Sequence, residues 1–151
     1  MTNYENNAFF WQKVDSLYLS GSRRLIKKKG EQHDTYKNLV YPLDYARIED
    51  MKSVSDHGVA VYLGSDNRNK VSGLIVAADI LEKELDVKVL AGCTDEEIED
   101  VLRYLNQTEF QKTILIKRGN EVPDWAQGDN WDLEEILSFF MGFWKNMWIG
   151  M

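Results

Sequence analysis

The chain has 151 residues, about the length of one domain and enough to bury a hydrophobic core without disulfides. Its net charge of −7 argues against general nucleic-acid binding, because such binding depends on cations that neutralise phosphates. The single cysteine, Cys93, permits no internal disulfide, and no stretch has the roughly 20 apolar residues that a membrane span requires. Because Met1–Phe10 shows no secretory signal, we expect a cytoplasmic protein.

The first half of the chain is predicted to contain one helix followed by three strands. Apolar residues at helical spacing predict a helix over Ala8–Leu19, which Gly21 would end. Arg23–Lys29 is typical of a strand, and so is Leu39–Tyr45, which its proline interrupts. Alternation with a period of two predicts another strand over Gly58–Gly64.

The second half is predicted to contain strands on both sides of one helix. The strands are expected over Val71–Ile80, Val87–Ala91 and Lys112–Lys117. Thr94–Gln107 is the strongest helix prediction, because its first residue and Glu97 can form a capping box ahead of an apolar face. Short strands, with a helix between the late ones, predict an α+β domain.

The C-terminal residues Gly119–Met151 differ in composition from the rest of the chain. They hold six acidic residues against one lysine, and apolar residues at helical spacing predict a helix over Asp132–Trp148. We therefore divide the chain into residues 1–118 and an acidic extension over residues 119–151. The predicted helix either packs on the same domain or presents aromatic residues to a protein partner, since tryptophan is enriched at interface hot spots. The candidate partner-binding residues are Trp125, Trp131, Trp144 and Trp148.

Carboxylates and cations are interleaved around a proline-anchored aromatic turn, Tyr41-Pro42-Leu43-Asp44-Tyr45. Carboxylates supply hard oxygen ligands for Mg²⁺, and Lys and Arg neutralise phosphate oxygens. Asp86 and Lys88 are two residues apart on a predicted strand, so their side chains face the same way. The pattern is typical of a site that holds a polyphosphate through divalent metals, with an ordinary surface ion pair as the alternative for Asp86 and Lys88.

These residues resemble the soluble inorganic pyrophosphatases, in particular a short, divergent bacterial branch of that family. The resemblance covers roughly Phe10–Arg118 and is carried by Gly30–His33, Tyr36, Tyr41–Tyr45, Asp79, Asp86–Lys88 and Gly92–Ile98. It implies a small five-stranded OB-like β-barrel with flanking helices. It also implies Mg²⁺-dependent hydrolysis of pyrophosphate or a related phosphoanhydride, in which a metal lowers the pKa of the attacking water.

The resemblance implies a role for each site residue. The implied catalytic residues are Asp79, Asp86 and Tyr45; the metal ligands are Asp56, Asp79 and Asp86; the phosphate contacts are Lys29, Lys88 and Arg24. A buried structural tyrosine, hydrogen-bonded through its hydroxyl, is the competing interpretation of Tyr45.

The acidic loop of the family is degenerate in this chain. The family pattern Asp-Gly-Asp-x-x-Asp reads here as residues Ser55–Ala60, so that Ala60 replaces the last aspartate. Losing one carboxylate from a metal cluster would weaken or abolish the hydrolase activity. The alternative is a catalytically silent acidic protein that binds a basic partner, such as an immunity or inhibitor protein for a basic toxin or nuclease. The oligomeric state is left open.

Overall fold

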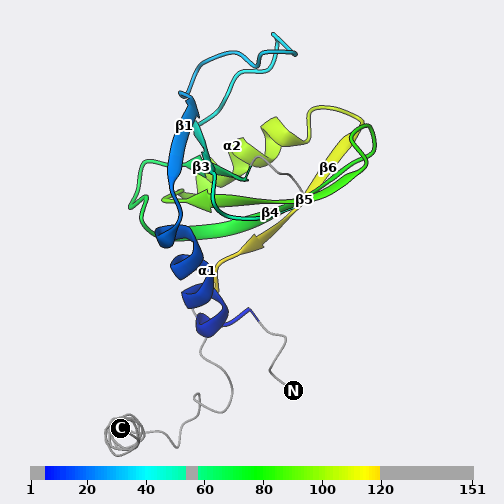
Figure 1. Ribbon diagram of the computed structural model, residues 1–151. Helices are drawn as coiled ribbons and strands as arrows, with labels where there is room; N and C mark the ends of the chain where they lie inside the picture. Colours follow the sequence, from blue (N-terminus) through cyan, green and yellow to red (C-terminus); the bar gives the residue numbers. More distant parts are fainter. Residues whose placement is uncertain (1–5, 54–57, 120–151) are drawn as a thin grey trace, which may run out of the picture.

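One mixed β-sheet runs through the structure, a computed structural model in which residues 6–53 and 58–119 are described. Its strands, in chain order, are β1 (Arg23–Lys27), β2 (Asp44–Ile48), β3 (Val59–Leu63), β4 (Val71–Asp79), β5 (Glu84–Ala91) and β6 (Gln111–Lys117). In space they are ordered β1-β2-β3-β5-β4-β6 (Figure 1). Neighbouring strands are antiparallel except β3 and β5, which are parallel.

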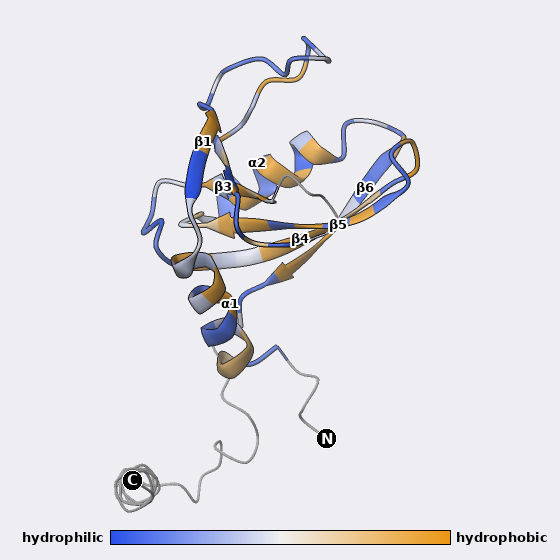
Figure 2. Cartoon of the chain, in the orientation of Figure 1, coloured by the Kyte–Doolittle hydropathy of each residue, from blue (hydrophilic) through white to orange (hydrophobic). Residues whose placement is uncertain are grey.

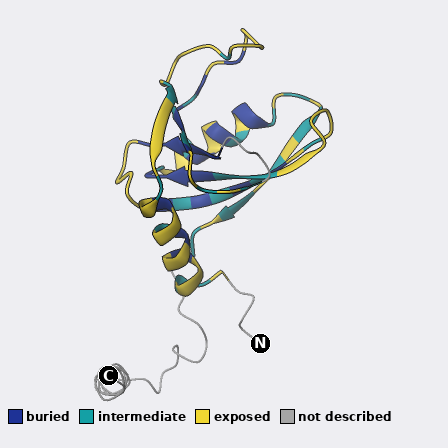
Figure 3. Ribbon diagram, viewed as in Figure 1, coloured by how far each residue is buried: buried dark blue, intermediate teal, exposed yellow. Residues whose placement is uncertain are grey.

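Two helices cover opposite faces of this sheet, α1 (Ala8–Ser20) and α2 (Asp95–Leu105). The side chains of a strand point alternately to its two faces. On β3, Ala60 and Tyr62 therefore join the hydrophobic cluster under α2, whereas Val61 joins the cluster under α1. Apolar residues follow the central strands (Figure 2), which are buried, whereas much of α1 and the far end of the β4–β5 hairpin are exposed (Figure 3).

Both helices begin at residues whose side chains satisfy free backbone N–H groups. The side chain of Asn7 accepts hydrogen bonds from the first turn of α1, and α1 ends at Gly21, as predicted. The capping box of α2 is present: Thr94 accepts from the Glu97 backbone, and the Glu97 side chain accepts from the Thr94 backbone. The amphipathic pattern predicted for this helix is confirmed, with Ile98 and Val101 among its buried residues.

The α+β class is confirmed, but the expected five-stranded closed barrel is not the form of this sheet. The sheet has six strands and is open, because β1 and β6 each pair with a single neighbour. The strand predicted over Leu39–Tyr45 was placed too early, since β2 spans Asp44–Ile48. The residues before β2 belong to a long loop, residues 28–43, in which Gln32 and Val40 form an isolated bridge.

None of the helices in the described part of the chain is long and apolar enough to cross a membrane. The predicted helix over Asp132–Trp148 and the division of the chain at residue 118 involve residues beyond 119, which lie outside the described ranges.

Candidate functional site

A cavity of about 360 Å³ lies on the face of the sheet that α2 covers. Its walls come from strands β2 to β6, the end of α2, the loop of residues 28–43 and the loop of residues 106–110. Ligand pockets commonly measure roughly 300–1,000 Å³, so this volume suits a small ligand or a single side chain of a partner. We call it the tyrosine cavity. Its lining residues are His33, Thr35, Tyr36, Leu39, Tyr41, Tyr45, Tyr62, Asp79, Leu81, Glu82, Lys88, Tyr104, Leu105, Thr108, Phe110 and Gln111.

Four tyrosines from four different elements form the inner wall. The ring centroids of Tyr41 and Tyr45 lie 5.2 Å apart, and those of Tyr45 and Tyr62 also lie 5.2 Å apart. Tyr104, from α2, lies 5.4 Å from Tyr41 and 6.5 Å from Tyr62. All four separations are within the range at which aromatic rings attract one another. The tyrosines thus form one continuous aromatic cluster.

Burial extends the pH range over which these four phenols are neutral. It is the main cause that raises the pKa of Tyr41, Tyr45, Tyr62 and Tyr104 above the ordinary value for tyrosine. The hydroxyls of Tyr41 and Tyr104 also hydrogen-bond each other. A neutral phenol offers an aromatic face, one O–H donor and an acceptor oxygen. The wall can therefore contact both the planar and the polar parts of a ligand.

The mouth of the cavity is also aromatic. Tyr36, which is 40% exposed, has its ring 5.3 Å from His33 and 6.0 Å from Phe110. The imidazole of His33 stacks on Tyr41 at 6.0 Å and accepts the backbone N–H groups of Thr35 and Tyr36 through Nδ1. These contacts fix the loop of residues 28–43 against the sheet.

Charged groups from the β4–β5 hairpin stand on one side of the cavity. Asp79 Oδ1 accepts the backbone N–H groups of Leu81 and Glu82, at 2.9 and 3.0 Å, and so caps the turn of the hairpin. On β5, Lys88 Nζ lies 3.3 Å from Asp86 Oδ2, and both side chains are largely buried. The other oxygen of Asp86 accepts the Ser53 hydroxyl at 3.0 Å.

The antiparallel register explains why these charges share one face. Ala77 pairs with Asp86, Asp79 pairs with Glu84, and Ile75 pairs with Lys88. Side chains directly opposite one another on neighbouring strands project from the same face of a sheet. Asp79, Asp86 and Lys88 therefore belong to the face that carries Ile75 and the tyrosine cluster.

The structure brings together some of the residues predicted from the sequence. Tyr45, Asp79 and Lys88 line the same cavity, and Asp86 adjoins it through its ion pair with Lys88. The third predicted metal ligand, Asp56, lies outside the described residues. Across residues 6–53 and 58–119, no group of three His, Cys, Asp or Glu side chains is placed to hold a metal ion.

Asp79 and Asp86 fit a magnesium ion poorly. Mg²⁺ requires several oxygen ligands in near-octahedral geometry. One oxygen of Asp79 already accepts two backbone N–H groups, and both oxygens of Asp86 are engaged by Ser53 and Lys88. The two carboxylates are thus used in holding the hairpin and Lys88.

The two other predicted phosphate contacts lie away from the cavity. Arg24 is on the edge strand β1, where its guanidinium pairs with Glu49. The backbone N–H of Lys29 donates to Asp44 Oδ1 at 2.9 Å. Neither residue lines the tyrosine cavity. The four tryptophans predicted to bind a partner, Trp125, Trp131, Trp144 and Trp148, are outside the described residues.

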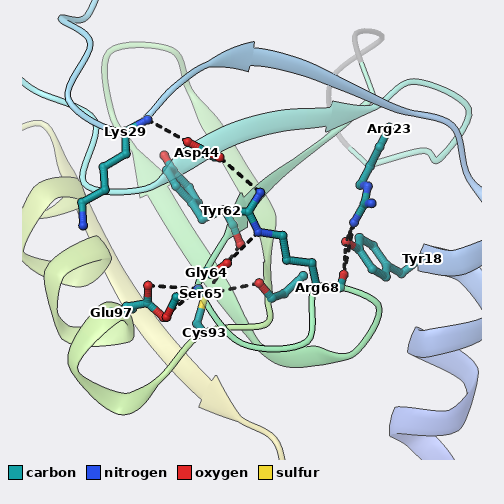
Figure 4. A network of polar contacts seen from close by, with 11 residues as sticks. Tyr18, Arg23, Lys29, Asp44, Tyr62, Gly64, Ser65, Arg68, Cys93 and Glu97 are labelled. Carbon is teal, nitrogen blue, oxygen red and sulfur yellow. Dashed lines mark hydrogen bonds and ion pairs between the residues drawn. The ribbon is translucent and has the colours of Figure 1, made fainter.

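A polar network around Arg68 fixes β2 against the end of β3 (Figure 4). Arg68 Nε donates to the Gly64 carbonyl at 2.6 Å, and Nη1 lies 3.1 Å from Asp44 Oδ2. The backbone carbonyl of Arg68 accepts the hydroxyl of Tyr18 at 2.6 Å, and Nη1 of Arg23 at 3.1 Å. The Lys29 backbone N–H, and then Arg68, hold the pKa of Asp44 below its ordinary value. The network is structural, since its main contacts join elements of this chain.

The single cysteine does not line the tyrosine cavity. Cys93 lies at the end of β5, where its thiol contacts the backbone carbonyls of Tyr62 and Ala91 at 3.6 Å. Burial, and then the carboxylate of Glu97, raises its pKa to about 12. Because the thiolate is the reactive form, the Cys93 thiol is unreactive at neutral pH.

Sequence reasoning did not identify Tyr62, Tyr104 or Glu82 as site residues. Tyr62 was detectable as the large residue on the second face of the alternating β3 pattern. Tyr104 stands three residues after Val101 on the apolar side of α2. Nothing in the local sequence pairs either residue with the turn that holds Glu82, because only the strand order brings them together.

Comparison with known proteins does not assign the chain to a family. A scan against protein-family models, a search of curated proteins and a search of solved structures each gave no match. The likeness to the pyrophosphatases stays a prediction from the sequence.

Proposed function

We propose that this protein is a non-catalytic, acidic binding protein that recognises a basic protein partner through the tyrosine cavity. The observation that carries the proposal is the continuous tyrosine wall beside two carboxylates, Asp79 and Glu82. Aromatic faces and carboxylates both attract cations. The wall suits binding, because neutral phenols offer aromatic faces together with hydroxyl groups.

The charge of the whole chain supports the same proposal. A net charge of −7 gives the molecule a negative field that speeds its encounter with a basic protein. Tyrosine is well suited to such an interface, since it buries a large rigid area and keeps a polar group. A basic toxin or nuclease inhibited by this protein is the kind of partner that fits.

Affinity purification with a matched pair of variants tests this function. Tyr36→Ala removes an accessible ring from the mouth of the cavity, and Phe10→Ala removes a similarly exposed ring from α1. We expect the wild-type chain and the Phe10→Ala variant to retain the same basic protein, and Tyr36→Ala to lose it. The retained protein is then purified and its affinity measured by calorimetry at low and high salt, where we expect weaker binding at high salt.

The proposal fails if the reconstituted pair does not bind, or if binding is unaffected by Tyr36→Ala. A combined Trp144→Ala and Trp148→Ala variant separates the cavity from the C-terminal extension. Loss of binding in this variant alone would place the recognition surface in residues 119–151 instead.

Pyrophosphate hydrolysis is the second candidate, and one observation favours it. Tyr45, Asp79 and Lys88, which the resemblance to pyrophosphatases implies as site residues, do line one cavity. The test is phosphate release from pyrophosphate at saturating Mg²⁺. Release that is lost in an Asp79→Asn variant would support this candidate and contradict the non-catalytic proposal; release at background level would exclude it.

A further inference from the structure

We propose that the group inserted into the tyrosine cavity is the guanidinium of an arginine side chain of the partner. This inference rests on the proposed binding function and makes it more specific. It is carried by the hydrogen-bond acceptors on the charged side of the cavity, at Asp79, Glu82 and Gln111, together with its aromatic wall.

Acceptors outnumber donors on the charged side of the cavity. Asp79 uses Oδ1 for the hairpin turn, while its Oδ2 accepts no hydrogen bond from another described residue. The carboxylate of Glu82 likewise makes no hydrogen bond or ion pair within the described ranges. Gln111 donates through Nε2 to the Leu105 carbonyl at 2.9 Å, which leaves Oε1 as an acceptor. A guanidinium carries five N–H donors and no acceptor, so it matches this supply.

The cations already present do not cancel the negative charge of the cavity. Lys88 is the lysine in the wall, and Asp86 neutralises it at 3.3 Å. Arg47, which is outside the lining, has its guanidinium 5.7 Å from the ring centroid of Tyr45 and offsets only one of the two carboxylates in the lining. The two carboxylates that remain, Asp79 and Glu82, leave the cavity with a net negative charge. A second cation therefore meets attraction from both carboxylates and from the faces of the tyrosine rings.

The aromatic wall distinguishes arginine from lysine. A guanidinium is planar, stacks on aromatic rings and is weakly hydrated, whereas an ammonium is a compact and strongly hydrated charge. Entry into a wall built from Tyr41, Tyr45, Tyr62 and Tyr104 requires the cation to lose water. The smaller dehydration cost favours the guanidinium.

Two short peptides of equal length and charge test this preference with the full-length protein. One carries a single arginine and the other a single lysine in the same uncharged sequence, and NMR titration reports the affinity and the cavity resonances that move. We expect the arginine peptide to bind about tenfold more tightly, which corresponds to about 1.4 kcal/mol. We expect Glu82→Gln to lower the affinity for the arginine peptide about threefold. Glu99→Gln is the control, because it removes the same charge from an exposed position on α2.

The remaining outcomes contradict either the arginine preference or the assignment of the cavity as a cation site. Equal affinities for the two peptides, reduced equally by Glu82→Gln, would contradict the arginine preference and leave the proposed binding function in place. If neither peptide at millimolar concentration moves a cavity resonance, the cavity is not a cation site. If the isolated basic partner still binds in that case, the binding function stands and its surface lies elsewhere.

Discussion

Arg68 shows how one exposed-loop residue determines the position of several elements. Its guanidinium joins Asp44, at the start of β2, to the carbonyl of Gly64, just after β3. Its own backbone carbonyl receives the hydroxyl of Tyr18 from α1. The Arg68 side chain can hold both partners because a planar guanidinium donates hydrogen bonds in two directions at once.

We predict that Arg68→Lys lowers the free energy of unfolding by about 1–2 kcal/mol, because lysine cannot make both the Gly64 and the Asp44 contacts. Urea unfolding followed by circular dichroism measures the change. Arg103→Lys is the matched control, since Arg103 makes only an exposed i,i+3 pair with Asp100; we expect a change within about 0.5 kcal/mol. Equal effects of the two substitutions would contradict a special role for Arg68.

Because of Cys93, the stability of the fold varies with pH in the alkaline range. Burial raises its pKa from the ordinary 9.0 to about 12 in the folded state. Below pH 9 the Cys93 thiol is protonated in both the folded and the unfolded chain, so its contribution to the stability of the fold is fully present there. Between pH 9 and 12 the unfolded chain loses the proton and the folded chain keeps it, so stability falls as pH rises.

We predict that the free energy of unfolding decreases between pH 8 and pH 10, and that Cys93→Ala makes this decrease smaller. One fully shifted group contributes up to about 1.4 kcal/mol per pH unit. Part of the decrease should remain in the variant, because burial also raises the pKa of Tyr62 and Tyr104. Urea titrations at each pH measure it. Parallel curves for the wild-type chain and the variant would show that Cys93 does not contribute.

At the scale of elements, the ends of the parallel strands β3 and β5 approach each other closely at glycines. A Cβ on Gly64, just after β3, would lie 2.2 Å from the Gly92 carbonyl oxygen. Gly92, just after β5, has a φ of +62° and the backbone of Arg68 within 3 Å of its missing Cβ. Only glycines allow the two chain segments to pass here.

We predict that Gly64→Ala lowers the free energy of unfolding by about 3 kcal/mol, because backbone atoms rather than a movable side chain oppose the new methyl group. Gly30→Ala is an informative comparison. Gly30 has a φ of +92° with no atom within 4 Å of its missing Cβ, so it tests conformational strain without a clash. We expect a smaller loss there, about 1 kcal/mol. Thermal unfolding of both variants measures the difference, and a larger loss at Gly30 would contradict the steric argument.

The elements that carry their own local signals were predicted well. The helix α2 has a capping box and an apolar stripe, and β3 is a short apolar segment that is buried on both faces, and both were placed within a few residues. The error before β2 has a physical origin. Leu39, Tyr41 and Leu43 alternate inward and are buried, but they pack on the cluster under α2 from a loop rather than from a long strand ladder.

Local sequence patterns could not predict that the sheet is open, nor which residues complete the cavity wall. Alternation specifies which face a residue occupies and not which strand lies beside it. Tyr45, Asp79 and Lys88, which the resemblance predicted as site residues, line the cavity, whereas Tyr62 and Tyr104 also line it and were not predicted. Those two join the site through the order of the strands and the packing of α2, which depend on contacts between distant parts of the chain.

At the scale of the whole molecule, the sheet consists of two antiparallel halves. Strands β1, β2 and β3 form one half, and β5, β4 and β6 form the other. The parallel ladder that joins them is short, running from Val61 opposite Val89 to Leu63 opposite Ala91. The β4–β5 ladder is longer, running from Val71 opposite Ala91 to Asp79 opposite Glu84.

We predict that the two halves differ in hydrogen exchange. Backbone amides of β4 and β5 should exchange with a higher opening free energy than those of β1 and β2, because the short parallel ladder is the weakest connection within the sheet. Native-state exchange at increasing low urea concentrations, followed by NMR, measures both groups. One common opening free energy for all four strands would show instead that the sheet opens as a single unit.

The parallel ladder between β3 and β5 also determines at what stage of folding the cavity can form. Tyr45 and Tyr62 belong to the first half of the sheet, while Asp79 and Lys88 belong to the second, which is synthesised later. Strand β5 must enter between β3 and β4, a pairing of distant segments that forms slowly compared with a local hairpin. A chain still emerging from the ribosome therefore has Tyr45 and Tyr62 but no cavity, and the tyrosine cavity can form only after β5 has joined the two halves.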